Sequence, residues 1–194
     1  MTQPANNLRV RRTQKLLRDA LIELIEERGF EAITVGEITE RAMVSRAAFY
    51  RNYQDKYNLV EQIFTEAMQA LFNVISESDT EHPPQIWVKF FEHIAEYEKL
   101  YCALLGRKGS PWFVLKMRMS MLELIKQISS WQPSANRPLY PPSDEFVPDI
   151  VATMFVEAIT WWLEQGRPYP PQEIAKRCAL LVSAIFMETS TWQS

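Results

Sequence analysis

The chain has 194 residues, 47% of them hydrophobic, and is long enough to bury the cores of a small N-terminal domain and a larger second domain. Its 21 Lys and Arg against 24 Asp and Glu give a formal net charge of −3, which by itself is only a weak argument against nucleic-acid binding. No segment reaches the roughly 18 uninterrupted apolar residues of a membrane span, and the N-terminus lacks a signal-peptide core, so we expect a cytoplasmic protein.

The distribution of charge along the chain is more informative about nucleic-acid binding than the net charge. Residues 1–57 carry ten basic and eight acidic side chains, whereas the remainder carries 11 basic and 16 acidic ones. This polarity fits an N-terminal end that faces DNA and an acidic body, although proteins of other functions also show it.

The first predicted helix runs from Leu8 to about Arg28. Its apolar residues recur every three or four positions, which is typical of an amphipathic helix. Gly29 is expected to end it, because glycine readily adopts the left-handed conformation found after a helix C-terminus.

Three helix starts then follow one another between Ile33 and Leu59. Thr34 with Glu37 three positions later predicts a capping box, Ser45 is expected to cap a second helix, and Asp55 a third. The first two helices are separated only by a tight turn. This pattern is typical of a helix-turn-helix, whose second helix can enter the DNA major groove, although capped short helices also occur in domains that do not bind DNA.

The second helix, predicted from Ser45 to about Tyr53, has one apolar and one polar face. Phe49 and Tyr53 are expected to point into the core, which leaves arginine, tyrosine and a small residue on the outside. Such a face suits contacts to phosphates and base edges. The candidate base-side residues are Arg46, Tyr50 and Asn52, with Ala47 allowing close approach, and the candidate phosphate-side residues are Thr34, Ser45, Arg51 and Lys56.

The segments Arg11-Arg12, GFEAITV and AMVSRAAFYRNYQDKYNL together resemble the DNA-binding domain of the tetracycline-repressor (TetR) family of bacterial regulators. The resemblance covers Arg11 to Leu59. Two positions depart from it: Met43 stands where the family usually has glycine, and Gly36 where many members carry a longer residue able to touch DNA. If residue 43 needs a left-handed backbone, methionine costs on the order of 1 kcal/mol there.

The rest of the chain also reads as helical, with no strand pattern. The sequence therefore predicts an all-α protein: a three-helix helix-turn-helix head in residues 1–55, and a bundle of about five to six helices for ligand binding and dimerisation in residues 56–194. We predict four further helices: Asp55 to about Ser78, Ile86 to Tyr97, Tyr101 to Leu105, and Pro111 to about Trp131. An exposed loop is expected over Gln132 to Asp144. Two more helices follow, one that begins between Asp144 and Pro148 and ends at Gln165, and one from about Gln172 to Thr189.

The last predicted helix has apolar stripes on two sides, so both sides need covering. Either the helix is central to the body, or a second subunit buries one face. The resemblance favours the second option, because the family places its dimer interface on the last two long helices. The candidate interface residues are Met154, Ala158, Trp161, Trp162, Leu180, Ser183, Ala184 and Met187.

The middle of the chain is rich in aromatic residues and methionine. Most of these side chains must form the core, but bulky adaptable residues can also line an apolar ligand cavity. The segment Phe90 to Phe113 loosely resembles a TetR subgroup that includes regulators of dihydroxyacetone metabolism. The candidate pocket residues are Phe64, Met68, Trp87, Phe90, Phe91, His93, Tyr97, Trp112, Met117 and Met121.

Catalytic and cofactor motifs are not found. There is no P-loop, dinucleotide fingerprint or glycine-flanked nucleophilic serine. Cys102 and Cys178 are expected to be buried thiols, and we expect no metal site, no cofactor and no enzymatic activity.

The resulting prediction is a homodimeric regulator, most simply a repressor. It would bind a palindromic operator in double-stranded DNA under the control of a small apolar effector. Two alternatives stay open: a helical coactivator or small-molecule-binding protein without sequence-specific DNA contact, and a helical enzyme that uses the apolar pocket.

Overall fold

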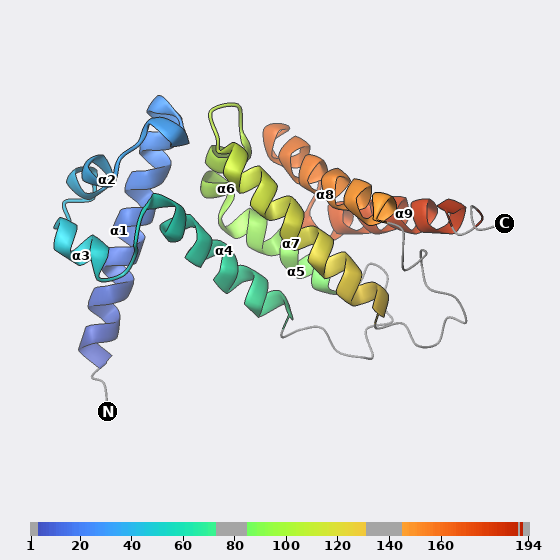
Figure 1. Ribbon diagram of the computed structural model, residues 1–194, viewed down its shortest axis with the longest axis horizontal. Helices are drawn as coiled ribbons and strands as arrows, with labels where there is room; N and C mark the ends of the chain where they lie inside the picture. Colours follow the sequence, from blue (N-terminus) through green and yellow to red (C-terminus); the bar gives the residue numbers. More distant parts are fainter. Residues whose placement is uncertain (1–3, 73–84, 131–144, 190, 192–194) are drawn as a thin grey trace. The chain divides into compact units, whose positions relative to one another are not determined.

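The structure is a computed structural model, and it describes residues 4–72, 85–130, 145–189 and 191 (Figure 1). Over these ranges the chain forms α-helices and one short 3-10 helix, and no strand, so the predicted all-α fold is confirmed. The predicted loop over Gln132 to Asp144 lies outside the described residues. The elements are α1 (Pro4–Arg28), η1 (Phe30–Ala32), α2 (Val35–Arg41), α3 (Arg46–Tyr50), α4 (Lys56–Phe72), α5 (Gln85–Glu96), α6 (Glu98–Leu105), α7 (Pro111–Ser130), α8 (Phe146–Glu164) and α9 (Pro171–Thr189).

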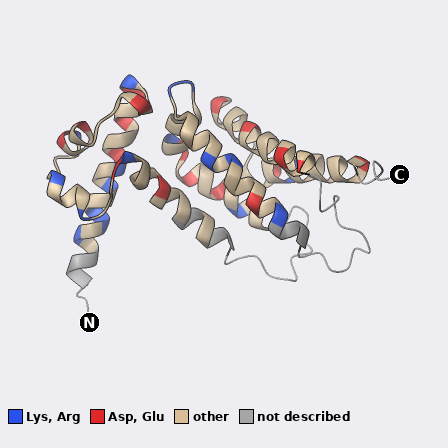
Figure 2. Cartoon of the chain, viewed as in Figure 1, with Lys and Arg blue, Asp and Glu red and all other residues tan. Residues whose placement is uncertain are grey.

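Several Lys and Arg residues of the N-terminal region lie on α1 and at α3 (Figure 2). Of these elements, α3 is the one that the sequence assigns to DNA contact, and cations there can meet phosphate. The exposed basic residues are Arg9, Arg11, Arg12, Lys15 and Arg28 on α1, and Arg46 and Arg51 at the two ends of α3.

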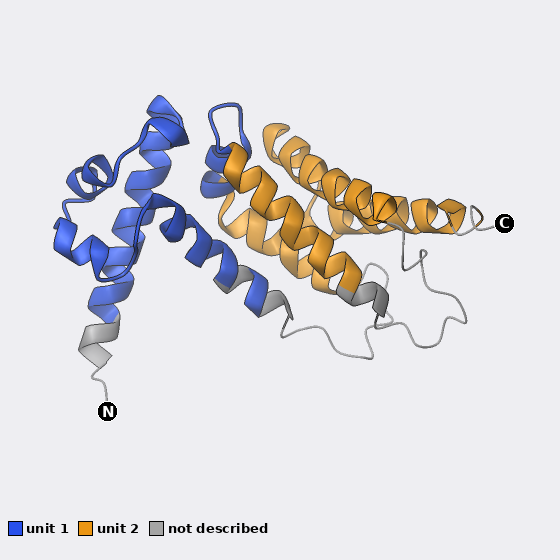
Figure 3. Ribbon diagram, viewed as in Figure 1, with its two compact units in different colours: residues 1–69, 99–110 blue, residues 70–98, 111–194 orange. Residues whose placement is uncertain are grey.

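The chain divides into two compact units (Figure 3). The head unit contains residues 1–69 and 99–110, and the body unit contains residues 70–98 and 111–194. The head unit thus includes all of the predicted DNA-binding domain, residues 1–55, together with most of α4, most of α6 and the loop that follows α6. The ligand-binding and dimerisation roles of residues 56–194 stay predictions.

The core of the head forms where α1 meets the short helices. Leu17, Leu21 and Ile25 lie one or two turns apart on α1 and are fully buried, as are Ile38 of α2 and Phe49 of α3. Helix α1 begins four residues earlier than predicted, at Pro4, because proline is well suited to the first turn of a helix. It ends as predicted at Gly29, whose φ is 83°.

The predicted caps are all present. The Thr34 side chain accepts the Glu37 N–H while the Glu37 side chain accepts the Thr34 N–H, which completes the capping box. The Ser45 hydroxyl accepts the Ala48 N–H at 3.2 Å, and the Asp55 carboxylate accepts the Asn58 N–H at 2.7 Å. These local hydrogen bonds set where α2, α3 and α4 begin.

Helix α3 ends earlier than predicted, at Tyr50 rather than near Tyr53. The Asn52 side-chain amide donates to the Ala48 carbonyl at 2.7 Å. Side-chain bonds of this kind compete with continuation of the helix, which accounts for the shorter element.

The turn between α2 and α3 is a Schellman motif. The Met43 N–H donates to the Glu40 carbonyl at 3.1 Å and the Val44 N–H to the Thr39 carbonyl at 2.9 Å. Met43 therefore occupies the left-handed position, with φ 51°, as the sequence suggested. The residue is 94% exposed, so it gains no buried contact in return for this backbone strain.

The body unit is built from packed helices with an aromatic core. Helix α7 packs on α8, and α9 packs on both α5 and α8. Trp87 of α5 stacks on Phe155 of α8 with ring centroids 4.2 Å apart, and Phe91 meets Trp162 edge-on at 5.4 Å. Contacts of this kind hold the long α8–α9 hairpin against the rest of the unit.

Helix α8 is long and apolar enough to cross a membrane if length and composition alone are considered. Half of its most apolar window is buried inside the protein. Asp149 and Glu157 also interrupt the apolar run. The helix therefore has the composition expected of a core helix. Its length and apolar composition are weak evidence for a membrane span, because buried core helices share them.

Met43→Gly should raise the free energy of unfolding by about 1 kcal/mol, because glycine adopts the left-handed conformation without strain. Urea unfolding monitored by circular dichroism measures the change. Gly166 follows the end of α8 as Met43 follows the end of α2, with φ 67° and open space where a Cβ atom would lie. Gly166→Ala is therefore the matched substitution in the opposite direction. It should destabilise by a similar amount. A Met43→Gly protein no more stable than the wild type contradicts the assignment of strain.

Candidate nucleic-acid interface

Helix α3 presents two different faces. Phe49 and the following Tyr53 are buried, as their spacing predicts. Arg46, Ala47 and Tyr50 are exposed on the other face. The helix is therefore anchored by aromatic side chains on one side and offers charged and polar groups on the other.

The outward side chains are free to meet a partner. Tyr50 is 58% exposed, and its ring packs edge-on against the buried Phe49 at 5.4 Å, which restricts its direction. In the ranges that the structure covers, neither Arg46 nor Arg51 has an ion-pair partner. Two cations and a phenol thus lie at the surface of one short helix and its C-terminal cap.

Three other predicted contact residues are engaged in local structure. The oxygens of Thr34 and Ser45 accept backbone N–H groups as helix caps, and the Asn52 amide donates to the Ala48 carbonyl. Hydrogen bonds from the Thr34 backbone and hydroxyl also hold the pKa of Glu37 below its ordinary value. These residues position α2 and α3, and any contact to a partner is additional to that role.

Lys56 requires a correction. It was expected to face phosphate, but the side chain is buried and its ammonium donates to the carbonyls of Phe30, Glu31 and Ile33 at 2.8, 2.9 and 3.0 Å. The ammonium also lies 4.8 Å from the centre of the Phe30 ring. Burial lowers the pKa of Lys56. All of its donors are directed inward, so it clamps the connection between α1 and α2.

The same connection is held by a loop that is distant in sequence. The Phe30 N–H donates to the Lys108 carbonyl at 3.1 Å, and the Ser110 hydroxyl donates to the Glu31 carboxylate at 3.2 Å. The Tyr57 hydroxyl donates to the other Glu31 oxygen at 2.8 Å, and this bond raises the pKa of Tyr57. Element η1 is therefore fixed by α4 and by the loop after α6.

Ion pairs tie α2 to α1. Arg41 donates to both carboxylate oxygens of Glu27, at 2.8 and 2.9 Å, and to Glu23 at 3.1 Å. Its hydrogen bonds lower the pKa of Glu27. Arg28 pairs with Glu37. These contacts were not predicted from the sequence, because their partners are 9 to 18 residues apart and no local spacing signals them.

The predicted pocket residues are divided between the two units. Phe64 and Met68 belong to the head unit and are buried, whereas the other eight lie in the body unit. Of those eight, His93 and Tyr97 are half-buried with ring centroids 4.6 Å apart, and Trp112 is half-buried. The buried core members are Trp87, Phe90, Phe91, Met117 and Met121. A ligand cavity among these side chains stays a prediction.

The predicted interface residues lie on a largely exposed apolar face of α8 and α9. Trp161, Leu180 and Met187 are exposed, as are Ser183 and Ala184, while Met154 and Ala158 are half-exposed. Trp162 requires a correction, because it is fully buried within the chain itself. Its indole N–H donates to the Tyr169 carbonyl at 2.8 Å. Trp161, one position earlier, is therefore the tryptophan available to a partner.

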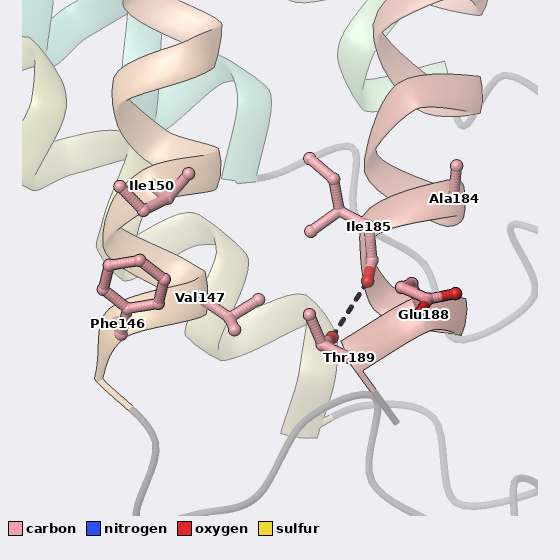
Figure 4. Close-up of a pocket in the computed structure, with 7 residues that line it drawn as sticks. All are labelled: Phe146, Val147, Ile150, Ala184, Ile185, Glu188 and Thr189. Carbon is pink, nitrogen blue, oxygen red and sulfur yellow. Dashed lines mark hydrogen bonds between the residues drawn. The ribbon is translucent and has the colours of Figure 1, made fainter. Parts of the chain in front are cut away.

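A groove of about 410 Å³ lies between the start of α8 and the end of α9 (Figure 4). Its lining is apolar apart from Glu188 and Thr189, and the Thr189 hydroxyl already donates to the Ile185 carbonyl at 2.9 Å. None of the predicted pocket residues lines it. The lining residues are Phe146, Val147, Ile150, Ala184, Ile185, Glu188 and Thr189.

Taken together, the head has the construction of a helix-turn-helix DNA-binding domain. Two capped helices meet at a tight turn, the second is anchored by its aromatic face, and its outer face carries arginine and tyrosine. In the covered ranges no cluster of side chains is suited to hold a metal ion. The class of protein defined by this fold and surface is a DNA-binding transcriptional regulator.

Comparison with known proteins agrees with this class. Residues 17–63 match the bacterial regulatory proteins of the tetR family, and residues 81–184 match a transcriptional regulator C-terminal region. The second match alone covers more than half of the chain. The chain belongs to the tetR family of bacterial regulatory proteins.

Individual relatives support the same conclusion. The uncharacterized HTH-type transcriptional regulator YxbF of Bacillus subtilis (strain 168) is 36% identical over 70 residues, which are 34% of this chain and 18% of that protein. The chain spans between 18% and 37% of the length of the curated relatives it matches.

Two solved structures share the fold. The dihydroxyacetone kinase operon activator DhaS has a TM-score of 0.62 at 18% identity, over 91% of this chain and 97% of that one. A TetR transcriptional regulator from Streptococcus agalactiae 2603V has a TM-score of 0.61 at 21% identity, over 92% and 97%. The arrangement of helices is thus shared at low sequence identity.

Lys56→Met should lower the free energy of unfolding by roughly 2 kcal/mol, because three backbone carbonyls lose their charged donor. Urea unfolding of the full chain measures the loss. Lys15→Met removes an exposed lysine from α1 and is the control, with an expected change within about 0.5 kcal/mol. Equal effects of the two substitutions contradict the structural role of Lys56.

Proposed function

We propose that the protein is a homodimeric, cytoplasmic repressor that binds a palindromic operator and is controlled by a small apolar effector. The observation that carries the proposal is the outer face of α3, where Arg46, Ala47 and Tyr50 are exposed while Phe49 and Tyr53 anchor the opposite side. A short helix held in this way can lie in the major groove with its side chains against base edges.

Each exposed residue has a distinct task in this proposal. Arg46 and Tyr50 meet base edges, and Ala47 lets the helix backbone approach closely. Arg51 meets phosphate, and Thr34 and Ser45 add contacts from helix starts. Asn52 and Lys56 are assigned to holding the domain together, because the Asn52 amide donates to the Ala48 carbonyl and the Lys56 ammonium donates to three carbonyls inside the head.

Dimerisation is supported by the apolar face of α8 and α9. Leu180 and Met187 of α9 are 62% and 75% exposed, and Trp161 of α8 is 43% exposed. Large exposed apolar side chains on two neighbouring helices favour a surface that another subunit covers. A two-fold dimer through this face would present two copies of α3 to half-sites about 34–36 Å apart.

The two-unit organisation is compatible with control by an effector, which we include in the proposal. The chain passes from the head unit into the body unit within α4. An effector that binds more tightly to one arrangement of the two heads shifts the population toward it, and operator affinity changes by the same difference in free energy. We assign the body a binding role and no catalytic one.

Arg46→Ala should weaken binding to the preferred operator about tenfold, because a well-placed arginine contact to a base contributes roughly 1–3 kcal/mol of discrimination. The probe is the duplex that the wild-type protein selects from a randomised pool, and fluorescence anisotropy across a salt series gives affinity and salt slope. Lys126→Ala on the exposed surface of α7 is the control. Lys56→Met should retain the wild-type salt slope.

Two outcomes would count against this proposal. Unchanged affinity of Arg46→Ala at fixed salt removes that residue from the interface. A wild-type protein that binds every duplex weakly and without salt dependence favours the coactivator alternative instead.

Leu180→Glu should convert the dimer to monomers, because a charge buried at an apolar interface costs on the order of 3 kcal/mol, or about a hundredfold in dimer affinity. Sedimentation equilibrium over a concentration series measures it. Leu115→Glu makes the same change at a leucine on α7 that is 48% exposed, and should leave the dimer intact. A monomeric wild type, or identical behaviour of the two variants, contradicts the interface.

A further inference from the structure

Arg46 lies across the start of the neighbouring helix α2. A Cβ atom built on Gly36 would lie 2.5 Å from Nη2 of Arg46, 3.4 Å from its Cζ and 3.7 Å from its Nε. Real Cβ atoms essentially never show contacts below 3.0 Å. The guanidinium therefore occupies the space that any side chain at position 36 would need.

The backbone gives no other reason for glycine at this position. Gly36 lies inside α2, and its φ is not in the left-handed region that Gly29 and Gly166 adopt. In such a position alanine is the better helix former, because glycine loses more conformational freedom on folding. Glycine at position 36 thus makes α2 less stable than alanine would, and its benefit is the space that it leaves for the Arg46 guanidinium.

The atoms that an added side chain would meet also differ between Gly36 and two other glycines of the chain. At Gly106 and Gly109 an added Cβ would meet backbone carbonyl oxygens, of Cys102 at 2.5 Å and of Leu104 at 2.1 Å, which cannot move without distorting the fold. At Gly36 it would meet the far end of one flexible, exposed side chain. A substitution there moves Arg46 and leaves the packing of the head alone.

We propose that Gly36 is a specificity-determining residue for DNA: it gives the Arg46 guanidinium room to lie against α2, and so decides which base Arg46 reaches. The inference rests on the proposed DNA-binding function. Bidentate recognition of a base by arginine depends on the placement of the planar guanidinium, so a side chain at position 36 that displaces it changes the preferred base. Gly36 acts through Arg46 and is a positioning residue.

The test is a double-mutant cycle in the full-length protein. Wild type, Gly36→Ala, Arg46→Ala and the double variant are compared by fluorescence anisotropy at one salt concentration. The probe is the duplex that the wild type selects from a randomised pool. Arg51→Ala, with and without Gly36→Ala, is the matched control, because Arg51 is an exposed arginine at the other end of α3.

Gly36→Ala should weaken binding about tenfold in the wild-type and Arg51→Ala backgrounds and have no effect in the Arg46→Ala background. Selection with Gly36→Ala should also return a different base at one position of each half-site. Thermal unfolding should be unchanged or shifted upward, which separates the effect from loss of folding. Gly36→Ser is a second variant with the same expected pattern in binding.

A readout without DNA follows the guanidinium itself. The Nε–Hε signal of Arg46 in nitrogen-15 NMR spectra should move on Gly36→Ala and stay in place on Glu40→Ala, an exposed substitution on the same helix. Wild-type affinity and base preference in Gly36→Ala, or an equal loss in the Arg46→Ala background, overturns the inference and leaves the proposed function standing. A wild type that selects no sequence overturns both.

Discussion

The head depends on a single buried ammonium. Lys56 is the first residue of α4, and it donates to three carbonyls of the segment that joins α1 to α2. Buried carbonyls without donors are costly, and a charged donor satisfies several at once. Helix α2 starts directly after this segment, and α3 follows α2 through a tight turn. The segment that Lys56 holds therefore sets the direction of α3.

The same segment is also held from outside the three-helix motif. The Lys108 carbonyl accepts the Phe30 N–H, and Ser110 reaches Glu31. A Cβ on Gly29 would lie 3.1 Å from the Lys108 carbonyl oxygen, so the two segments pass as closely as glycine allows. The head unit is therefore completed by residues that are some 80 positions away in sequence. The head unit extends beyond residue 55, which the sequence suggested as the end of the DNA-binding domain.

The parts of this structure that could be predicted are those with local causes. Thr34, Ser45 and Asp55 cap their helices through residues three positions away, so spacing alone reveals them. The clamp by Lys56 joins residues 23 to 26 positions apart, which no short pattern encodes.

Helix α8 shows a second limit. It is apolar on most sides, so periodicity could not decide between Trp161 and Trp162. The carbonyl of Tyr169, which accepts the indole N–H of Trp162, settles the choice. The contact of Arg46 with Gly36 was equally invisible, because it depends on the angle between two helices.

The size of the reading element explains why the apolar face on α8 and α9 matters for DNA binding. Helix α3 has five residues, and in the proposed complex two of its exposed side chains, Arg46 and Tyr50, meet bases. At roughly 1–3 kcal/mol for each good base contact, one head would discriminate by about 2–6 kcal/mol. A genome offers at least about 10⁶ competing sites, and rejecting them requires about 8 kcal/mol. One head is insufficient on this estimate, whereas two heads on a two-fold dimer reach the required range. The proposed dimer would thus supply the second reading helix that so short an element needs.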